Sequence, residues 1–260
     1  MTQVLVTRPE QDAASWVTSL QSAGLEAIQF PLLDLKPVLG AADVESVLAK
    51  IQSSQAVMFV SANAVRFLAD VLSGYPEWVS HFKQNARAWC TGPGTAAALL
   101  ACGLEEHRID QPNLQAKQLD SEALWQVVQA QIGPHLKVLF IRGADETGAI
   151  AGRDWLAQQL SLHGAQVDAL AAYQRQASQL SAQQIEQVRQ WVDQRAVWIF
   201  SSSACIQALV DQCSQVPWSN AKAVVTHPRI AALAQQLGWR NVSIAAPGMK
   251  AMLASIKSMA

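Results

Sequence analysis

The chain has 260 residues, of which 50% are hydrophobic and only 15% are charged, and its formal net charge is −1. This length and composition suffice for one large domain or two of ordinary size, and the near-neutral charge without a basic run argues against a nucleic-acid partner. No apolar run approaches the length needed to span a bilayer, so we expect a cytoplasmic protein without a membrane segment.

The cysteines and histidines give no indication of a disulfide framework or a metal site. Cys90, Cys102, Cys205 and Cys213 form no CxxC pair and lie in apolar stretches, as reduced structural thiols do. The five histidines are scattered, without HxxxH or HExxH spacing. We therefore predict a protein that holds no metal.

Short β-branched runs alternate with helical stretches along the whole chain, which predicts βαβ units, a mostly parallel sheet and an α/β fold. The predicted strands, in chain order, are 4–7, 27–30, 57–60, 87–90, 137–141, 197–200, 223–226 and 242–245. Helical stretches between them include 10–24 and 147–164, and the second ends in a glycine where a helix C-cap would lie.

Three segments of the chain recur later in the same order. Residues 3–38 resemble 137–176, residues 56–68 resemble 196–209, and residues 86–104 resemble 221–239. Each pair shares its succession of strand, breaker and helix, which indicates an internal duplication with a joint near 133–137. We therefore predict two similar α/β lobes.

Polar or small residues follow nearly every predicted strand, at corners where a helix begins. In an open parallel sheet ligands bind beyond the carboxyl ends of the strands, and helix N-termini attract anions. Ser, Thr and Asn are also ordinary helix N-caps, so both interpretations stay open. The corner residues are Thr7, Arg8, Ser61, Ala62, Asn63, Gly92, Thr95, Arg142, Gly143, Ser201, Ser202, Ser203, Thr226 and His227.

One corner, GPGTAA, also fits a dinucleotide fingerprint. Gly92, Gly94 and Ala97 have the G-x-G-x-x-G/A spacing, and Asp110 follows at about the right distance. Pro93 removes an N–H group that a pyrophosphate would use, and the strand lies in the middle of its unit rather than first. We therefore regard a nucleotide cofactor as the weaker interpretation.

The two repeats leave their second strands through polar or proline-broken segments, 31–37 and 171–175. These segments are typical of connections between lobes. Tyr173 lies in the second of them and is one of two tyrosines in the chain. It is either a packed hinge aromatic or a phenol that faces a cleft and donates a proton.

An ordered set of short motifs is similar to one known family, uroporphyrinogen-III synthase, and above all to its proteobacterial members. The resemblance runs over the whole chain. The motifs are LVTRPE (5–10), FVSANAVRFL (59–68), TGPGTAAAL (91–99), SEAL (121–124), LFIRG (139–143), AAYQR (171–175), IFSSSACIQAL (199–209) and LAQQLGWRNVSIA (233–245).

The resemblance implies two flavodoxin-like α/β lobes joined by a two-stranded linker. One lobe would comprise residues 1–35 plus 174–260 and the other 36–173, with linkers near 31–38 and 171–177. It also implies a cytoplasmic monomer without a cofactor, which cyclises hydroxymethylbilane to uroporphyrinogen III with inversion of ring D and loss of water. A transient contact with the preceding enzyme of the pathway is a further expectation.

The resemblance also assigns roles to single residues. Tyr173 stands at the place of the family's candidate proton donor. Substrate contacts are implied for Arg8, Ser61, Thr95, Glu122, Arg142, Ser201 and Lys222. The last corner departs from the family, because Ile230 stands where many members have a threonine, and Thr226 or His227 is left to substitute. The alternative function is a non-catalytic two-lobed binding protein for an anionic small molecule.

Overall fold

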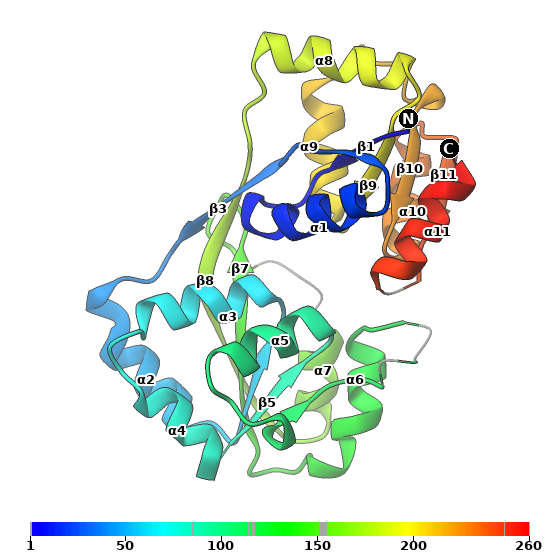
Figure 1. Ribbon diagram of the computed structural model, residues 1–260. Helices are drawn as coiled ribbons and strands as arrows, with labels where there is room; N and C mark the ends of the chain where they lie inside the picture. Colours follow the sequence, from blue (N-terminus) through cyan, green and yellow to red (C-terminus); the bar gives the residue numbers. More distant parts are fainter. Residues whose placement is uncertain are drawn as a thin grey trace. The chain divides into compact units, whose positions relative to one another are not determined.

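The computed structural model describes residues 2–84, 86–113, 115, 118–150, 155–246 and 248–259. The chain divides into two compact units, which Figure 1 shows in sequence colours. Unit 1 comprises Met1–Leu35 and Gln176–Ala260, and unit 2 comprises Lys36–Arg175. The second crossing between the units therefore falls two residues after the position that the resemblance implies.

Unit 1 is built on a five-stranded sheet in the order β11-β10-β9-β1-β2, in which every neighbouring pair is parallel. Its strands are β1 (Gln3–Val6), β2 (Glu26–Gln29), β9 (Val197–Phe200), β10 (Lys222–Val225) and β11 (Asn241–Ile244). Its helices are α1 (Glu10–Ser22), α8 (Ala182–Asp193), α9 (Ser203–Gln212), α10 (Pro228–Gln236) and α11 (Met249–Met259).

Alternate residues of the unit 1 strands pack into cores on opposite faces of the sheet. Val4 and Val6 join side chains of α1 and α11 in one core. Leu5 joins α8, α9 and α10 in the other, around a group of tryptophans that includes Trp198 and Trp239. The strands are apolar on both faces because helices cover both, as is usual in parallel sheets.

Unit 2 contains a six-stranded sheet in the order β3-β8-β7-β4-β5-β6, in which the pairs from β8 to β6 are parallel. Its strands are β3 (Leu33–Pro37), β4 (Ala56–Phe59), β5 (Arg87–Cys90), β6 (Ile109–Asp110), β7 (Lys137–Ala144) and β8 (Gln166–Ala177). Its helices are α2 (Val44–Gln52), α3 (Ala62–Val71), α4 (Glu77–Gln84), α5 (Pro93–Ala101), α6 (Ser121–Val128) and α7 (Trp155–Leu162). Part of the helical stretch predicted at 147–164 lies outside the described residues.

The unit 2 sheet is likewise covered on both faces. Met58 and Phe140 pack with Leu124 of α6 and Leu156 of α7. On the other face Phe59 meets Phe82 of α4, and α2 to α5 lie along that side in Figure 1. This arrangement leaves the strand ends as the places where polar side chains gather.

Apart from the additional edge strand β3 in unit 2, equivalent strands follow in the same order in the two sheets, and each sheet mixes the two sequence repeats. In unit 1, β1 of the first repeat pairs with β9 of the second. In unit 2, β7 of the second repeat pairs with β4 of the first. The first βαβ unit of each repeat therefore belongs to the same sheet as the later strands of the other repeat.

Both crossings between the units run through strands. β3 and β8 are neighbours in the sheet, and the backbone N–H of Val38 donates to the carbonyl of Ala172 at 3.3 Å. The sequence pattern placed a connection at 31–37 without predicting that it pairs as a strand. Pro37 ends β3, where a missing N–H costs no ladder bond.

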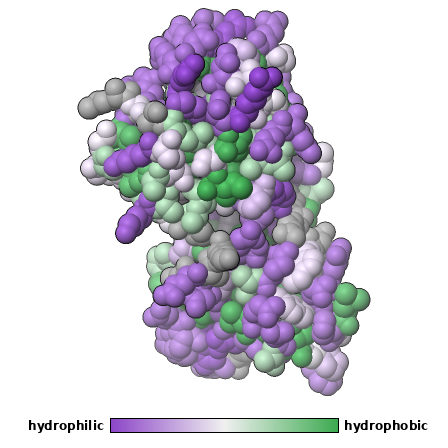
Figure 2. Space-filling view, turned by 90° about the vertical axis from the view of Figure 1, so that its right-hand side faces the viewer, coloured by the Kyte–Doolittle hydropathy of each residue, from purple (hydrophilic) through white to green (hydrophobic). Residues whose placement is uncertain are grey.

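Hydrophilic residues make up most of the face shown in Figure 2, and hydrophobic residues gather there in small areas. Within the described residues, we find no helix with the length and hydrophobicity needed to cross a membrane.

Candidate functional site

Ser61 forms the corner between β4 and α3 in unit 2. Its backbone is extended, with φ −161° and ψ 161°, and its Oγ accepts the N–H of Ala64 at 3.1 Å. This is the geometry of a helix N-cap. Ala62 opens α3, and the buried Asn63 accepts a hydrogen bond from Nη1 of Arg66 at 2.9 Å. The cap fixes the Ser61 hydroxyl at the carboxyl end of β4.

Tyr173 is placed by a bulge between β7 and β8. Arg142 pairs with Ala171, but the next residue, Gly143, pairs with Tyr173, so β8 contains one extra residue. Such bulges redirect side chains. A Cβ atom on Gly143 would lie 2.6 Å from Cζ of Tyr173. Only glycine at position 143 therefore leaves room for the phenol ring as it lies.

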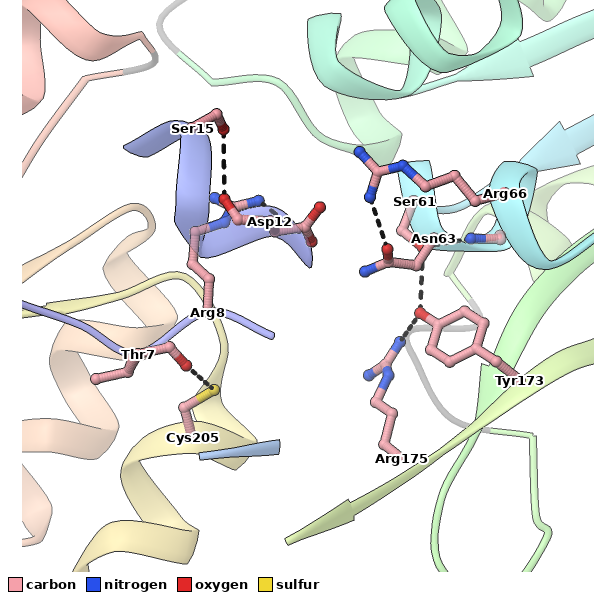
Figure 3. Close-up of polar contacts among 11 residues, drawn as sticks. Thr7, Arg8, Asp12, Ser15, Ser61, Asn63, Arg66, Tyr173, Arg175 and Cys205 are labelled. Carbon is pink, nitrogen blue, oxygen red and sulfur yellow. Dashed lines mark hydrogen bonds and ion pairs between the residues drawn. The ribbon is translucent and has the colours of Figure 1, made fainter. Parts of the chain in front are cut away.

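The Tyr173 hydroxyl lies between two polar groups of its own unit, which Figure 3 shows as sticks. Its Oη is 3.1 Å from Oγ of Ser61 and accepts a hydrogen bond of 3.1 Å from Nη2 of Arg175. Phe67 stacks on the ring, with centroids 5.2 Å apart. The side chain is only 2% exposed. Of the two alternatives that the sequence left open for Tyr173, this burial agrees with a packed aromatic. The contact with Arg175 was not predicted.

Arg142 lies at the same edge but is nearly covered. It is 5% exposed, and its guanidinium carbon lies 5.6 Å from the centroid of the Phe140 ring. β7 continues through it to Ala144, so Arg142 belongs to the strand rather than to a corner loop.

The β5–α5 corner is neutral and tightly held. Gly92 is the N-cap residue of α5, and Thr95 is buried within the first turn. The Cys90 thiol donates to the Gly92 carbonyl at 3.9 Å. Burial raises the pKa of Cys90 to about 11, so the thiol stays protonated at neutral pH and acts as a structural group.

Asp110, the acidic residue that a dinucleotide site would need, is instead engaged in an ion pair. Asp110 is 8% exposed and pairs through both oxygens with Arg87, with Nη2 of the arginine 2.6 Å from Oδ1. Nε2 of Gln131 also donates to it at 3.1 Å. A carboxylate held in this way serves the pairing of β5 with β6. Glu122, another predicted contact, lies in the first turn of α6 and is partly exposed.

In unit 1, the corner after β1 holds Thr7 and Arg8, which Figure 3 also shows. The buried Thr7 hydroxyl donates to the Ile199 carbonyl at 2.7 Å and so ties β1 to β9. Arg8 lies over the Trp16 ring, 4.8 Å from its centroid, and Nη2 is 3.9 Å from Oδ2 of Asp12. This arginine is therefore held by α1.

The Ser-rich corner after β9 differs from the predicted alignment by one residue. Ser202, not Ser201, is the N-cap of α9, and its Oγ accepts the N–H of Ala204 at 3.2 Å. Ser203 is already helical. Ser201 and Ser202 are partly exposed at the carboxyl end of β9. The Oγ atom of Ser203 is buried and has no hydrogen-bond partner among the described residues.

The corner after β10 contains Thr226 and His227. Nδ1 of His227 accepts the N–H of Arg229 at 3.1 Å and caps α10, which requires this nitrogen to be unprotonated. Ile230, at the position of the missing threonine, is 2% exposed and packs in the core.

Lys222 is not brought together with these corners. It begins β10, at the amino end of the strand, and its Nζ donates to the backbone carbonyl of Met259. His227 follows the carboxyl end of the same strand, so the two side chains start from opposite edges of the sheet.

Among the residues that the structure describes, no three histidine, cysteine, aspartate or glutamate side chains are grouped so that they could hold a metal ion. In both units the predicted residues that do gather lie at the carboxyl ends of parallel strands. These ends carry backbone N–H groups, hydroxyls and arginines, a set suited to anionic groups.

The fold and these corners define an α/β protein of two doubly wound units, and comparison with known proteins identifies its family. The family model described as uroporphyrinogen-III synthase HemD matches residues 14–254. The chain therefore belongs to the uroporphyrinogen-III synthase family, which comprises cyclising lyases of tetrapyrrole biosynthesis.

Individual relatives agree with this assignment. The chain is 25% identical to uroporphyrinogen-III synthase of Escherichia coli (strain K12) over 250 residues. The aligned region covers 93% of this chain and 94% of that protein.

Solved structures show the same fold. That of uroporphyrinogen-III synthetase from Helicobacter pylori 26695 aligns with a TM-score of 0.65 at 16% identity and covers 100% of both chains. A mutant uroporphyrinogen III synthase from the extremely thermophilic bacterium Thermus thermophilus aligns with a TM-score of 0.61 at 12% identity, over 100% of this chain and 98% of that one.

Proposed function

We propose that this protein is a uroporphyrinogen-III synthase that cyclises hydroxymethylbilane, with inversion of ring D and loss of water, to uroporphyrinogen III in haem biosynthesis. The observation that carries the proposal is the family match over residues 14–254. The chain supports it by keeping a tyrosine, Tyr173, in a defined hydrogen-bond network at the carboxyl edge of its sheet.

The reaction begins with departure of the substrate hydroxyl. Protonation of that oxygen lets it leave as water, and the pyrrole nitrogen supplies electrons to the resulting azafulvene cation. General acid catalysis of such a step contributes roughly 10²- to 10⁴-fold. Tyr173 is the proton source that we assign to it, because its phenol is held by Ser61 and Arg175.

The eight carboxylates of hydroxymethylbilane match corners that are rich in hydroxyls and backbone N–H groups, two of which also carry an arginine. In unit 2 these are the corners at Ser61–Asn63, Gly92–Thr95 and Arg142–Gly143, and the family resemblance adds Glu122 on α6. In unit 1 they are Arg8, Ser201–Ser203 and Thr226–His227. Helix N-termini and capping hydroxyls bind carboxylates without a lysine cluster. The protein must hold the linear substrate in a folded shape, so that the substituted carbon of ring D is attacked. This contribution to catalysis comes from proximity and orientation.

The burial of the Tyr173 phenol is the observation that favours a second candidate, a non-catalytic protein that binds an anionic small molecule. Family membership favours the cyclase. We further propose that the protein acts as a cytoplasmic monomer in transient contact with the enzyme that supplies its substrate. Light scattering during size-exclusion chromatography measures the oligomeric state.

The deciding experiment is an isomer assay. Hydroxymethylbilane is generated in situ, the protein is added, and the oxidised porphyrins are separated by chromatography. Spontaneous closure gives isomer I, so an excess of isomer III demonstrates the activity. If only isomer I forms in the presence of folded protein, the chain has the fold of the family but not its activity. That result would favour the non-catalytic binding protein.

A further inference from the structure

Ser61 is the partly exposed end of a chain of polar groups whose inner members are Tyr173 and Arg175. Resting on the proposed function and deepening it, we propose that Ser61 is the catalytic residue that hands the proton to the leaving hydroxyl. Tyr173 replaces this proton by donating its own to Ser61, and Arg175 positions the phenol.

The direction of the first hydrogen bond is fixed by chemistry. A guanidinium has only donors, so Arg175 donates to the phenol oxygen across the 3.1 Å contact. The hydrogen of Tyr173 must then point to another acceptor. Ser61 Oγ, also 3.1 Å from the phenol oxygen, is the acceptor that the described residues provide. We assign Tyr173 as the donor to Ser61, because the reverse direction would leave the hydrogen of the buried phenol without an acceptor among the described residues.

The second step follows from the lone pairs of Ser61. Its Oγ already accepts the N–H of Ala64 at 3.1 Å, and with Tyr173 as a second donor both lone pairs are used. The hydrogen of Ser61 itself has no acceptor among the side chains and backbone groups that the structure describes. It is therefore available to a bound substrate.

The two hydroxyls also differ in solvent exposure, and this difference agrees with proton transfer from Tyr173 through Ser61 to the substrate. Tyr173 is 2% exposed, and Phe67 and Gly143 cover its ring. Ser61 is partly exposed at the start of α3. A substrate oxygen can thus reach the serine hydroxyl without displacing the phenol. The fixed cap and the stacked ring keep the relay aligned before substrate arrives, which favours proton transfer.

The proton transfer balances as follows. The carbon–oxygen bond of the hydroxymethyl group breaks, and its electron pair leaves with the oxygen. The proton of Ser61 joins that oxygen to give water, the proton of Tyr173 moves to Ser61, and the negative charge left on the phenol oxygen lies beside the guanidinium of Arg175. After attack at the substituted carbon of ring D, the bond from that carbon to the old methylene bridge breaks, and this methylene rejoins the ring at its unsubstituted α-carbon. That carbon then releases one proton, which restores Tyr173 along the same path.

The test compares Ser61→Ala, Tyr173→Phe and the double variant in single turnovers, with isomer III as the product measured. We expect each single change to slow isomer III formation about a hundredfold without abolishing it. The double variant should be no slower than the slower single variant, because both changes interrupt one path. Effects that multiply would overturn the relay, as would an unchanged rate in Ser61→Ala.

Two further variants separate the relay from the helix cap. Ser181 caps α8 through its Oγ, which accepts the N–H of Gln184, so Ser181→Ala removes a matched cap and should leave the rate unchanged. Ser61→Thr keeps a hydroxyl and should retain most of the rate. A Ser61→Thr protein as slow as Ser61→Ala would contradict proton donation by residue 61.

Rates in mixtures of light and heavy water give a readout that a structural role would not move. Two protons in flight produce a curved dependence on deuterium fraction, and one proton a straight line. We expect a curve for the unmodified protein and a line for Tyr173→Phe. A straight line for both overturns the relay but leaves the cyclase intact, whereas isomer I alone from the unmodified protein overturns both.

Discussion

The two units differ at the strand pair that their duplication makes equivalent. In unit 1, β1 ends at Val6, and Arg8 lies beyond it in a loop against α1. In unit 2, β7 runs on to Ala144, so that Arg142, the arginine of the second repeat, is still within the strand and 5% exposed. Equivalent residues thus lie in different surroundings.

The cause is β8, which extends from Gln166 to Ala177 because it also leads into the other unit. Its added length gives β7 a partner beyond the usual strand end, and the bulge there brings Tyr173 over Gly143. The duplication that the sequence indicates accounts for two similar sheets, whereas the proton relay that we propose uses residues of unit 2.

The largest effect that we expect comes from Gly143→Ala. The new methyl group would lie 2.6 Å from Cζ of Tyr173, so the ring must move and its hydroxyl must leave Ser61 and Arg175. Isomer III formation should fall about a hundredfold, as on loss of a general acid. Overpacking should also cost about 1–3 kcal/mol of the free energy of unfolding, measured by urea denaturation.

Gly133→Ala is the matched control, because a Cβ atom there meets nothing within 4 Å. It should keep both activity and stability. A Gly143→Ala protein with full activity would show that Tyr173 does not need its present position.

The next effect compares Arg87 and Lys222, which begin equivalent strands of the two units. Arg87→Ala leaves the Asp110 carboxylate buried without its bidentate partner, and should lower the free energy of unfolding by about 3 kcal/mol. Lys222→Ala removes a bond to a neutral carbonyl and should cost about 1 kcal/mol. Urea denaturation followed by circular dichroism measures both, and equal losses would contradict this account of the strand ends.

A smaller difference between the units is expected in the rates at which their cysteine thiols are labelled. Cys205 and Cys213 of unit 1 and Cys90 of unit 2 are buried, whereas Cys102 is partly exposed. Burial raises the pKa of Cys90 to about 11 and raises those of Cys102 and Cys213 as well. At pH 8 an aromatic disulfide reagent should therefore label Cys102 first in the folded protein. If Cys102→Ser leaves the fast phase in place, another thiol is more accessible than its burial indicates.

The smallest effect concerns the pH dependence of a surface ion pair in unit 2. The Lys50 ammonium lowers the pKa of Asp168 by a hydrogen bond. A carboxyl whose pKa is lowered by folding stabilises the folded state above its ordinary pKa, and this contribution is lost as pH falls through the lowered value. Because Asp168 is largely exposed, the contribution is only about 0.5 kcal/mol.

Urea denaturation of the unmodified protein and Asp168→Asn should therefore differ at pH 7 and converge below about pH 4. Asp193→Asn, a change at an exposed carboxyl at the end of α8 in unit 1, should produce no such convergence. A constant difference across this range would mean that the pair does not act through ionisation of Asp168.

The regular elements could be predicted because buried strands have short β-branched runs, and the predicted strands lie within one residue of β1, β2, β4, β5, β9, β10 and β11. The residue pattern did not predict β3, because its polar and proline-containing sequence, LDLKP, is typical of a connection, and only the family resemblance implied a two-stranded linker there. β6 has only two residues and carries no periodicity. The exchange of strands between repeats was implied by family resemblance, since repeats alone suggest a cut near residue 135.

The candidate site was harder to predict than the strands. Corner residues could be found from strand ends, but Ser202 rather than Ser201 caps α9, because a one-residue difference in the start of a helix leaves no mark on the sequence. The bulge at Gly143 and the contact from Arg175 depend on register between strands. Lys222 was predicted to contact substrate, but the bounds of β10 show that it lies at the amino end of that strand, away from the corners.

The division of unit 1 into two chain segments has a consequence for biosynthesis. β1 occupies the inner part of its sheet, yet its neighbour β9 is translated roughly 190 residues later. At a synthesis rate of about 5–20 residues per second, the apolar strand waits about 10–40 s for that partner. Unit 2 is continuous and complete by then, so we expect it to fold first on the ribosome while β1 depends on chaperones to remain free of aggregation.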